Sequence, residues 1–279
     1  MDLVVQALEI DADALARIAD LAHARAIRVL ERSGPEAYRL MDATDGQSLR
    51  EACVQARVDH AFVDPGMRLH DVRVVAMDMD STLITIECID EIADMIGIKP
   101  QVAAITASAM RGEIDFPTSL TRRVALLAGL PVESLQRVYD ERLQLSHGAR
   151  RMLQGFKAVG ARTLLVSGGF TFFTDRLVER LPLDEALANV LEIVDGRLTG
   201  RVGEPIVDAA AKAERLAALR DRFAGAQGIT VAIGDGANDL PMLDIADVSI
   251  AYHAKPVVRA RTRYALDHCG LDAALNLFA

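Results

Sequence analysis

The feature that most constrains this chain is a set of short, almost uninterrupted apolar runs in its last three quarters. They are VRVVAM at 72–77, RTLLV at 162–166, ITVAI at 229–233 and DVSIA at 247–251. A strand buried on both faces of a parallel sheet has this composition, whereas a strand with one solvent-exposed face alternates between apolar and polar residues. Helical patterns lie between these runs, at 147–159, 209–223 and 239–246. Strands that alternate with helices predict an α/β fold with a doubly wound, Rossmann-like parallel sheet.

A long connection between the first two runs has a helical pattern throughout, from about 88 to 145. Ile89, Ile92 and Ile96 fall on one helical face, and Leu120, Val124 and Leu127 fall on another. We therefore expect a helical cap inserted between two core strands. Ligands of open α/β sheets bind beyond the carboxyl ends of the strands, and an insert at this point would cover that edge. Farther along, Asp195-Gly196 lies between alternating segments at 190–201 and predicts a β-hairpin.

The first 68 residues have a different pattern. Strand candidates at 3–9, 26–31, 37–43 and 60–64 are interleaved with helices at 11–24 and 47–57, with turn residues at Ser33-Gly34-Pro35. This βαββαβ order is that of an α+β ferredoxin-like module, and it resembles the ACT-type regulatory fold in element order alone. We expect a domain over 1–68 and a second over 69–279. The small domain is equally well explained as a docking or dimerisation module.

Composition excludes several classes of protein. The 279 residues carry a net charge of −9, which argues against a broad nucleic-acid surface because phosphate backbones are bound through clustered Lys and Arg. No stretch approaches the length of ~20 apolar residues that a membrane-spanning helix requires. Cys53, Cys88 and Cys269 have no disulfide or metal-ligand spacing, so we expect reduced thiols and a cytoplasmic protein. The sequence allows a homodimer.

Two acidic motifs directly follow core runs. DMDST begins at Asp78, and GDGAND spans Gly234 to Asp239. A calcium loop that starts at Asp78 would require Gly at position 83 and Glu at 89, where this chain has Leu83 and Ile89. Two carboxylates after one core strand, together with a carboxylate after another, instead suit a hard cation with oxygen ligands, and Mg²⁺ fits best.

A third motif, SGGF at 167–170, follows another core run. Such a sequence is common in ordinary strand-to-helix turns, but a hydroxyl and exposed N–H groups at a helix N-terminus also cradle phosphate. Lys212 alone is typical of a solvated helix. Its place between SGGF and GDGAND makes it a candidate cation for a phosphate group.

Together, and in this order, DMDST, SGGF, Lys212 and GDGAND resemble the motifs of the haloacid dehalogenase superfamily of phosphotransferases. Over residues 72–279 the chain is most similar to members that hydrolyse phosphoserine, with matches in DMDSTLITIECIDEIA, SLTRRVALLAGLP, VSGGF and GDGANDLPML. The resemblance implies hydrolysis of O-phosphoserine to serine and phosphate through an aspartyl-phosphate, the last step of serine biosynthesis. Phosphoserine is then the small-molecule partner, with no nucleic acid or membrane involved.

The resemblance also implies roles for individual residues. Asp78 would be the nucleophile and Asp80 the general acid and base, and Mg²⁺ would be held by Asp78, the backbone of Asp80, and Asp235. The residues that it assigns to the substrate are Ser167, Gly168 and Lys212 for the phosphate, Glu87 and Arg123 for the ammonium and carboxylate, and Asn238. Met110 and Phe116 resemble apolar residues of the same pocket.

Two other functions fit parts of the sequence. A phosphotransferase of the same fold would pass phosphate to another acceptor, such as homoserine. A non-catalytic ligand-binding protein would work through its N-terminal module and would not need Asp78, whereas this chain retains that residue together with every partner motif.

Overall fold

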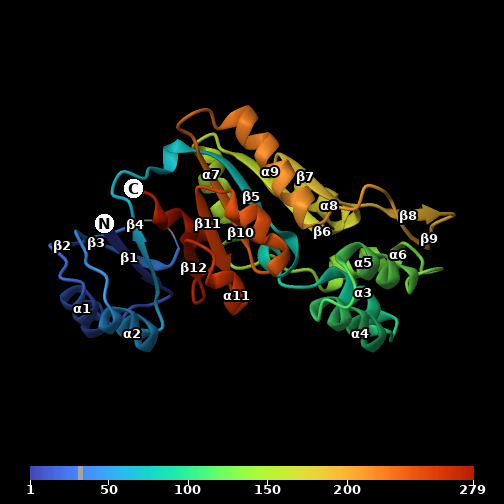
Figure 1. The fold of residues 1–279 in the computed structure, drawn as a ribbon, viewed down its shortest axis with the longest axis horizontal. Helices are drawn as coiled ribbons and strands as arrows, with labels where there is room; N and C mark the ends of the chain where they lie inside the picture. Colours follow the sequence, from blue (N-terminus) through green and yellow to red (C-terminus); the bar gives the residue numbers. More distant parts are fainter. Residues whose placement is uncertain (31–33) are drawn as a thin grey trace.

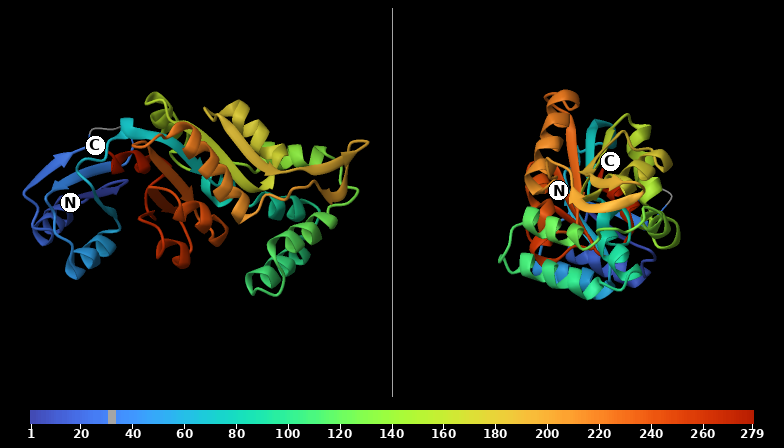
Figure 2. Two further views of the ribbon diagram at one scale, coloured as in Figure 1. Left: turned by 45° about the horizontal axis from the view of Figure 1, so that its top comes forward. Right: turned by 90° about the vertical axis from the view of Figure 1, so that its right-hand side faces the viewer.

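The computed structural model describes residues 1–30 and 34–279. Its parts follow one another along the longest direction of the molecule: an N-terminal module, an α/β core, and a helical insert at the end of the core remote from the module (Figures 1 and 2). The first residue of the turn predicted at Ser33-Gly34-Pro35 lies outside the described residues. So does the last residue of the strand predicted over 26–31.

The N-terminal module has the predicted βαββαβ order. Its elements are β1 (Asp2–Ala7), α1 (Ala12–Leu21), β2 (Ala26–Val29), β3 (Glu36–Met41), α2 (Gln47–Ala56) and β4 (Asp59–Val63). The strands form an antiparallel sheet in the order β2-β3-β1-β4, which is the ferredoxin-like arrangement. Asp11 caps α1 by accepting a hydrogen bond from Ala14 N. Apolar side chains of α1, α2 and the sheet form one core cluster.

The other face of this sheet packs on the core. Val4, Ala61 and Val63 belong to the same apolar cluster as the first core strand and the C-terminal segment. The buried Asp59 carboxylate accepts hydrogen bonds from the backbone N–H groups of 267, 268 and 269. Asn276 Nδ2 donates to Gln6 Oε1 at 2.9 Å. Buried polar groups that are paired across the contact fix the position of the module on the core.

The core is a parallel sheet in the order β12-β11-β10-β5-β6-β7. Its strands are β5 (Val72–Met77), β6 (Arg162–Phe170), β7 (Glu185–Asn189), β10 (Ile229–Gly234), β11 (Val248–Tyr252) and β12 (Tyr264–Leu266). Alternate side chains enter different apolar clusters: Val75 and Met77 lie in one, and Val74 and Ala76 in the other. The strand is therefore buried on both faces, which explains its continuous apolar sequence.

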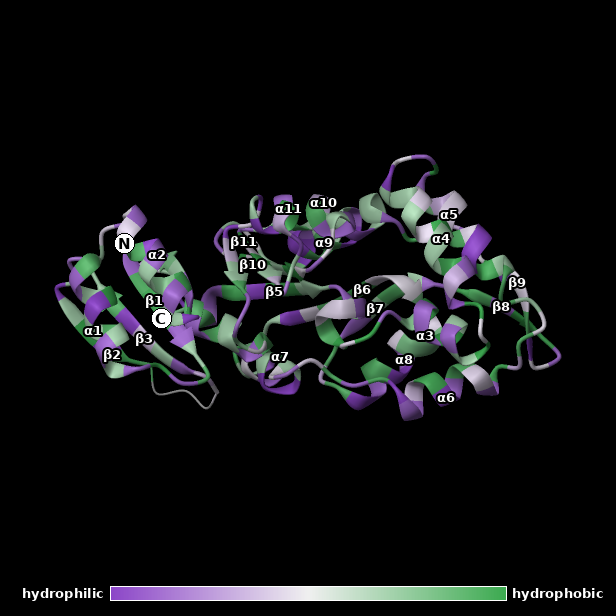
Figure 3. Ribbon diagram, turned by 90° about the horizontal axis from the view of Figure 1, so that it is seen from below, coloured by the Kyte–Doolittle hydropathy of each residue, from purple (hydrophilic) through white to green (hydrophobic). Residues whose placement is uncertain are grey.

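Helices cover both faces of the sheet, so the predicted doubly wound fold is confirmed. The helical segments around the sheet are α7 (Ala149–Ala158), α8 (Thr171–Arg180) and the 3₁₀ segment η4 (Leu271–Leu277) on one face, α9 (Ala209–Phe223) and α10 (Leu240–Asp244) on the other, and the short η1 (Leu69–Asp71), η3 (Ala237–Asp239) and α11 (Pro256–Arg259). In Figure 3 these helices carry both hydrophilic and hydrophobic segments, as expected for elements with one buried face.

The insert between β5 and β6 is helical, as predicted. It contains α3 (Cys88–Met95), α4 (Lys99–Met110), α5 (Phe116–Ala125) and α6 (Glu133–Glu141). A bridge between Ile84 and Leu145 joins its two connections to the core. The predicted hairpin, β8 (Leu191–Val194) and β9 (Arg197–Val202), turns at Asp195-Gly196 and lies against the insert (Figure 1). Leu198 pairs through its backbone with Gly129 and Leu130, so hairpin and insert form one lid.

None of the helices in the described ranges 1–30 and 34–279 combines the length and apolar character that a membrane crossing requires.

Candidate active site

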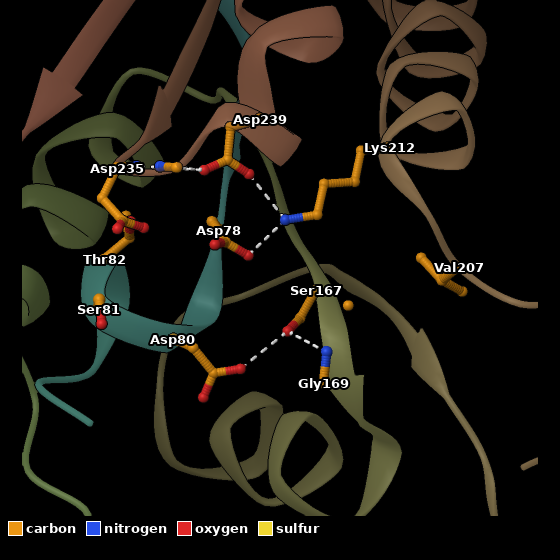
Figure 4. Close-up of polar contacts among 12 residues, drawn as sticks. Asp78, Asp80, Ser81, Thr82, Ser167, Gly169, Val207, Lys212, Asp235 and Asp239 are labelled. Carbon is orange, nitrogen blue, oxygen red and sulfur yellow. Dashed lines mark hydrogen bonds and ion pairs between the residues drawn. The ribbon is translucent and has the colours of Figure 1, made fainter. Parts of the chain in front are cut away.

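The chemical motifs meet at one edge of the core sheet. The chain runs from β5 to β6 and β7 on one side, and later to β10, β11 and β12 on the other, so the strand order reverses at β5. Crevices that form at such a reversal bind ligands at the carboxyl ends of the strands. Asp78 follows β5, Ser167 lies near the end of β6, and Asp235 follows β10. Figure 4 shows these side chains converging.

The turn after β5 sends its two carboxylates to different partners. Asp78 N donates to Ile233 O, which ties the start of the turn to β10. Residues Met79–Leu83 form a π-type turn (η2) in which Asp80 is extended and Ser81 has a φ of +56°. This left-handed conformation is costly for a residue with a Cβ, and such residues cluster at functional sites. As a result Asp78 points toward Lys212 while Asp80 points toward Ser167 (Figure 4).

Lys212 is a buried cation held between two carboxylates. It lies in the first turn of α9, whose cap residue Asp208 accepts from Ala211 N. Its side chain is 1% exposed, and its Nζ lies 2.6 Å from Asp78 Oδ1 and 2.7 Å from Asp239 Oδ1. Burial alone would lower the pKa of Lys212, but the two carboxylates outweigh burial and raise it. The ammonium is therefore permanently charged beside Asp78.

The loop after β10 brings two further carboxylates to this cation. Ligand oxygens of Asp78, Asp235 and Asp239 lie within 4.8 Å of one another, so the cluster could hold a metal ion. Asp239 has both oxygens occupied already, because Oδ1 accepts from Lys212 and Oδ2 accepts from the N–H groups of Asp235 and Gly236. A Cβ on Gly234 would lie 2.5 Å from the Asp239 carboxylate, so glycine is required there. Asp78 and Asp235 are the carboxylates with oxygens left for a cation.

The pKa values of these acids reflect burial and mutual repulsion. Burial and the charge of Asp239 raise the pKa of Asp78 well above its usual range, although Lys212 opposes the shift. The same two causes raise the pKa of Asp235 to about 6. Burial and the charge of Glu87 raise the pKa of Asp80 to about 7. Acids that are hard to ionise together fit a site that takes up a cation.

The SGGF segment contacts Asp80, the second carboxylate of the turn after β5. Gly169 N donates to Ser167 Oγ at 2.8 Å, and Ser167 Oγ donates to Asp80 Oδ2 at 3.4 Å (Figure 4). A Cβ on Gly168 would lie 2.9 Å from Cζ of Phe116, at the start of α5. The lid therefore reaches down onto this segment. SGGF itself continues β6 before α8 begins, rather than forming a turn.

The lid places two charged residues near the same acids. Glu87 is the cap residue of α3 and accepts a hydrogen bond from Ser81 Oγ at 2.7 Å. Burial lowers the pKa of Arg123, while the charges of Asp90, Glu87 and Asp80 oppose that shift. The charges of carboxylates in both the lid and the core therefore act on Arg123. Two other candidates are open to solvent: Met110 is 71% exposed, and Asn238 is also exposed.

Comparison with known proteins places this arrangement in a family. The sequence pattern of the haloacid dehalogenase-like hydrolases matches residues 75–244, and that of a domain of unknown function (DUF4072) matches residues 3–53. A phosphoserine phosphatase of Polaromonas sp. (strain JS666) is 52% identical over 219 residues, which cover 76% of this chain and 92% of that protein. The chain belongs to the phosphoserine phosphatase family. It is a phosphatase with a haloacid dehalogenase-like core.

Solved structures of the phosphatase family agree with this fold. The crystal structure of a probable phosphoserine phosphatase from Vibrio cholerae has a TM-score of 0.84 at 34% identity, over 99% of this chain and 85% of that one. The structure of a phospho-aspartyl intermediate analogue of phosphoserine phosphatase has a TM-score of 0.68 at 35% identity, over 75% of this chain and 99% of that one. The first similarity includes the N-terminal module.

Two buried residues of this candidate site were not among the sequence candidates. Asp239 ends the GDGAND motif, and a carboxylate four residues after Asp235 could have been recognised as a second partner for Lys212. Asn189 ends β7 and donates to Gly168 O at 2.9 Å. No sequence signal indicates Asn189, because its partners lie in distant segments.

Proposed function

We propose that this phosphatase hydrolyses O-phosphoserine to serine and phosphate through a phosphorylated Asp78. The observation that carries the proposal is the convergence of Asp78, Asp80, Ser167 and Lys212 at one sheet edge. That convergence occurs in a chain 52% identical to a phosphoserine phosphatase. The structure of a phospho-aspartyl intermediate analogue, similar in fold, supports the covalent route.

The chemistry begins at Asp78. A carboxylate that attacks a phosphate dianion brings negative charges together, so cations must be in place beforehand. Lys212 meets this requirement, because its Nζ lies 2.6 Å from Asp78 Oδ1 and because the carboxylates of Asp78 and Asp239 keep it charged in spite of its burial. Attack of a free Asp78 oxygen on phosphorus breaks the bond to the serine oxygen. An aspartyl-phosphate results, and one difficult hydrolysis becomes two displacements.

Asp80 moves the proton in both steps. In the first step it must be protonated to donate to the departing serine oxygen, and in the second it must be ionised to accept a proton from water. A pKa of about 7, raised by burial and by Glu87, allows both forms near neutral pH. The backbone N–H of Cys88 donates to Asp80 Oδ1 at 2.9 Å and holds the carboxyl in position.

We propose Mg²⁺ as the cation, held by Asp78, the backbone carbonyl of Asp80, and Asp235. The donors fit, because all are hard oxygens and because burial and the charge of Asp239 raise the pKa of Asp235 to about 6, so that a bound cation would favour its ionised form. When bound, Mg²⁺ would neutralise charge on the phosphoryl oxygens. Thr82 Oγ1 donates to Asp235 Oδ1 at 3.3 Å and orients that ligand.

Selection of serine would come from the lid. Ser167, Gly168 and Asn238 would contact the phosphoryl group, which every phosphate ester shares. Glu87 and Arg123 offer opposite charges for the ammonium and carboxylate of an amino acid, and Arg can bind a carboxylate in two places at once. The Phe116 ring lies against Gly168 and would cover the bound ester. Met110 would line the pocket after closure of the lid.

Phosphate release from a panel of monoesters tests this function. We expect phosphoserine to be the preferred substrate over phosphothreonine, phosphoethanolamine and p-nitrophenyl phosphate, with activity lost in EDTA and restored by Mg²⁺. Serine and phosphate should form in equal amounts when homoserine is added. A phosphorylated acceptor alcohol would identify a phosphotransferase, and equal rates for all esters would contradict selection by the lid.

Two wider expectations remain proposals. Cys53, Cys88 and Cys269 are buried free thiols. They support a cytoplasmic location, because the cytosol keeps protein thiols reduced. A homodimer remains a prediction from the sequence.

A further inference from the structure

A buried amide links the two sides of the candidate phosphate site. Asn189 ends β7 and is 1% exposed. Its Nδ2 donates to Gly168 O at 2.9 Å and to Val207 O at 3.3 Å, and its Oδ1 accepts from Val207 N at 2.7 Å. One side chain thus joins β6, β7 and the segment before α9. A buried amide with its donors and acceptor all paired has one orientation.

The contact with Gly168 fixes the Ser167–Gly169 segment, which we call the cradle and which forms one side of the candidate phosphate site. The carbonyl of Gly168 and the N–H of Gly169 belong to the same planar peptide group. Because Asn189 holds that carbonyl, it also sets the direction of the Gly169 N–H, which donates to Ser167 Oγ at 2.8 Å. The ladder between β6 and β7 is irregular here, with a register shift between Val166 and Phe170. The side chain of Asn189 supplies order where regular strand pairing is interrupted.

The contacts with Val207 fix the other side of the candidate phosphate site, which is the start of α9. Val207 directly precedes Asp208, the cap residue of α9, and Lys212 N donates to Asp208 O at the start of the helix. Asn189 binds both the N–H and the C=O of Val207, so it anchors the chain where the helix begins. The position of the Lys212 ammonium depends on that anchor. In Figure 4 Val207 and Lys212 both lie to the right of Asp78.

We propose that Asn189 is a positioning residue for phosphoryl transfer. It sets the distance between the Ser167–Gly169 cradle and the Lys212 ammonium without touching the substrate. This inference rests on the proposed function only in that the substrate carries a phosphoryl group, whatever its organic part. A small misplacement of groups that contact a reacting centre costs far more in rate than in folding.

The test compares two buried asparagines. Asn189→Asp keeps the shape and the acceptor for Val207 N but removes the donors to Gly168 O and Val207 O. Asn276→Asp is the matched control, since Asn276 is 2% exposed and its Nδ2 donates to Gln6 far from the site. The measurements are Tm, kcat, KM, and the inhibition constant of orthovanadate, a phosphoryl mimic. The parent is assayed first with phosphoserine and with p-nitrophenyl phosphate, and the better substrate is used throughout.

We expect Asn189→Asp to lower kcat and to raise the vanadate inhibition constant, each by about ten-fold or more. Asn276→Asp should leave kcat and the vanadate inhibition constant within about two-fold of the parent, because distant sites act independently. It should lower Tm by about as much as Asn189→Asp does. If Asn189→Asp does not fold, Asn189→Ser replaces it.

Kinetics of the Asn189 variant within two-fold of the control would overturn the inference, as would failure of both Asn189 variants to fold when the control folds. A parent that hydrolyses p-nitrophenyl phosphate but not phosphoserine would instead refute the proposed substrate and leave the comparison intact.

Discussion

Replacement of Lys212 by methionine tests the electrostatic account of the site. Methionine keeps the length and flexibility of the side chain but removes its charge. Lys212 Nζ lies 2.6 Å from Asp78 Oδ1 and 2.7 Å from Asp239 Oδ1. At an effective dielectric constant of about 20, each contact is worth about 6 kcal/mol of Coulomb energy. Burial of the charges offsets much of this.

The net loss follows from what remains after the substitution. Both carboxylates stay buried without their cation, and removal of one partner of a buried ion pair costs about 3–5 kcal/mol. We expect the free energy of unfolding in EDTA to fall by this amount. Added Mg²⁺ should stabilise the variant more than the parent, because the site has gained net negative charge. Loss of a positioned cation should lower kcat by about 10²–10³-fold.

Urea unfolding followed by circular dichroism measures the stability term, and phosphate release measures kcat. Lys157→Met is the matched control, because Lys157 Nζ lies 2.7 Å from Asp184 Oδ1 but is 35% exposed and remote from the site. It should cost no more than about 1 kcal/mol and leave kcat unchanged. The reasoning is refuted if Lys212→Met unfolds within about 1 kcal/mol of the parent, or if the two variants retain equal activity.

Three further outcomes follow from the site. Arg123→Ala should reduce kcat/KM for phosphoserine far more than for p-nitrophenyl phosphate, which has no carboxylate; equal losses for both esters would rule out a carboxylate contact. The single-turnover rate of serine release should fall as the pH rises past the pKa of Asp80, because the proton donor is lost, whereas hydrolysis of the intermediate should fall as the pH drops below it. Glu87→Gln removes one cause of the raised pKa, so the alkaline limb should move to lower pH, and a flat profile from mildly acidic to alkaline pH would contradict the role of Asp80.

The central strands could be predicted because burial on both faces leaves a plain signal. VRVVAM and ITVAI read as strands, and the motifs after them fall at one sheet edge by topology alone. The outer strands β7 and β12 were not predicted. β12 has only three residues, and most of β7 is half-buried, so neither carries an apolar run. Edge strands of this kind cannot be told from loops by composition.

The residue types of the site could be predicted from the sequence, but the contacts among them could not. The spacing of DMDST and GDGAND indicated a cation site, yet the roles of Asp239 and Asn189 depend on contacts across 27 and 21 positions of sequence. The docking of the N-terminal module is a stronger case, because Asp59 binds backbone groups about 210 positions away. Long-range hydrogen bonds to backbone leave no pattern in the sequence.

The central claim is that Asp78 takes the phosphoryl group onto itself. The most direct measurement is acid quenching of a single turnover with isotopically labelled phosphoserine, followed by peptide mapping. We expect the label on the peptide that contains Asp78, and neither label nor phosphate release with Asp78→Asn. Label on another residue, or phosphate release by Asp78→Asn at the rate of the parent, would contradict the mechanism.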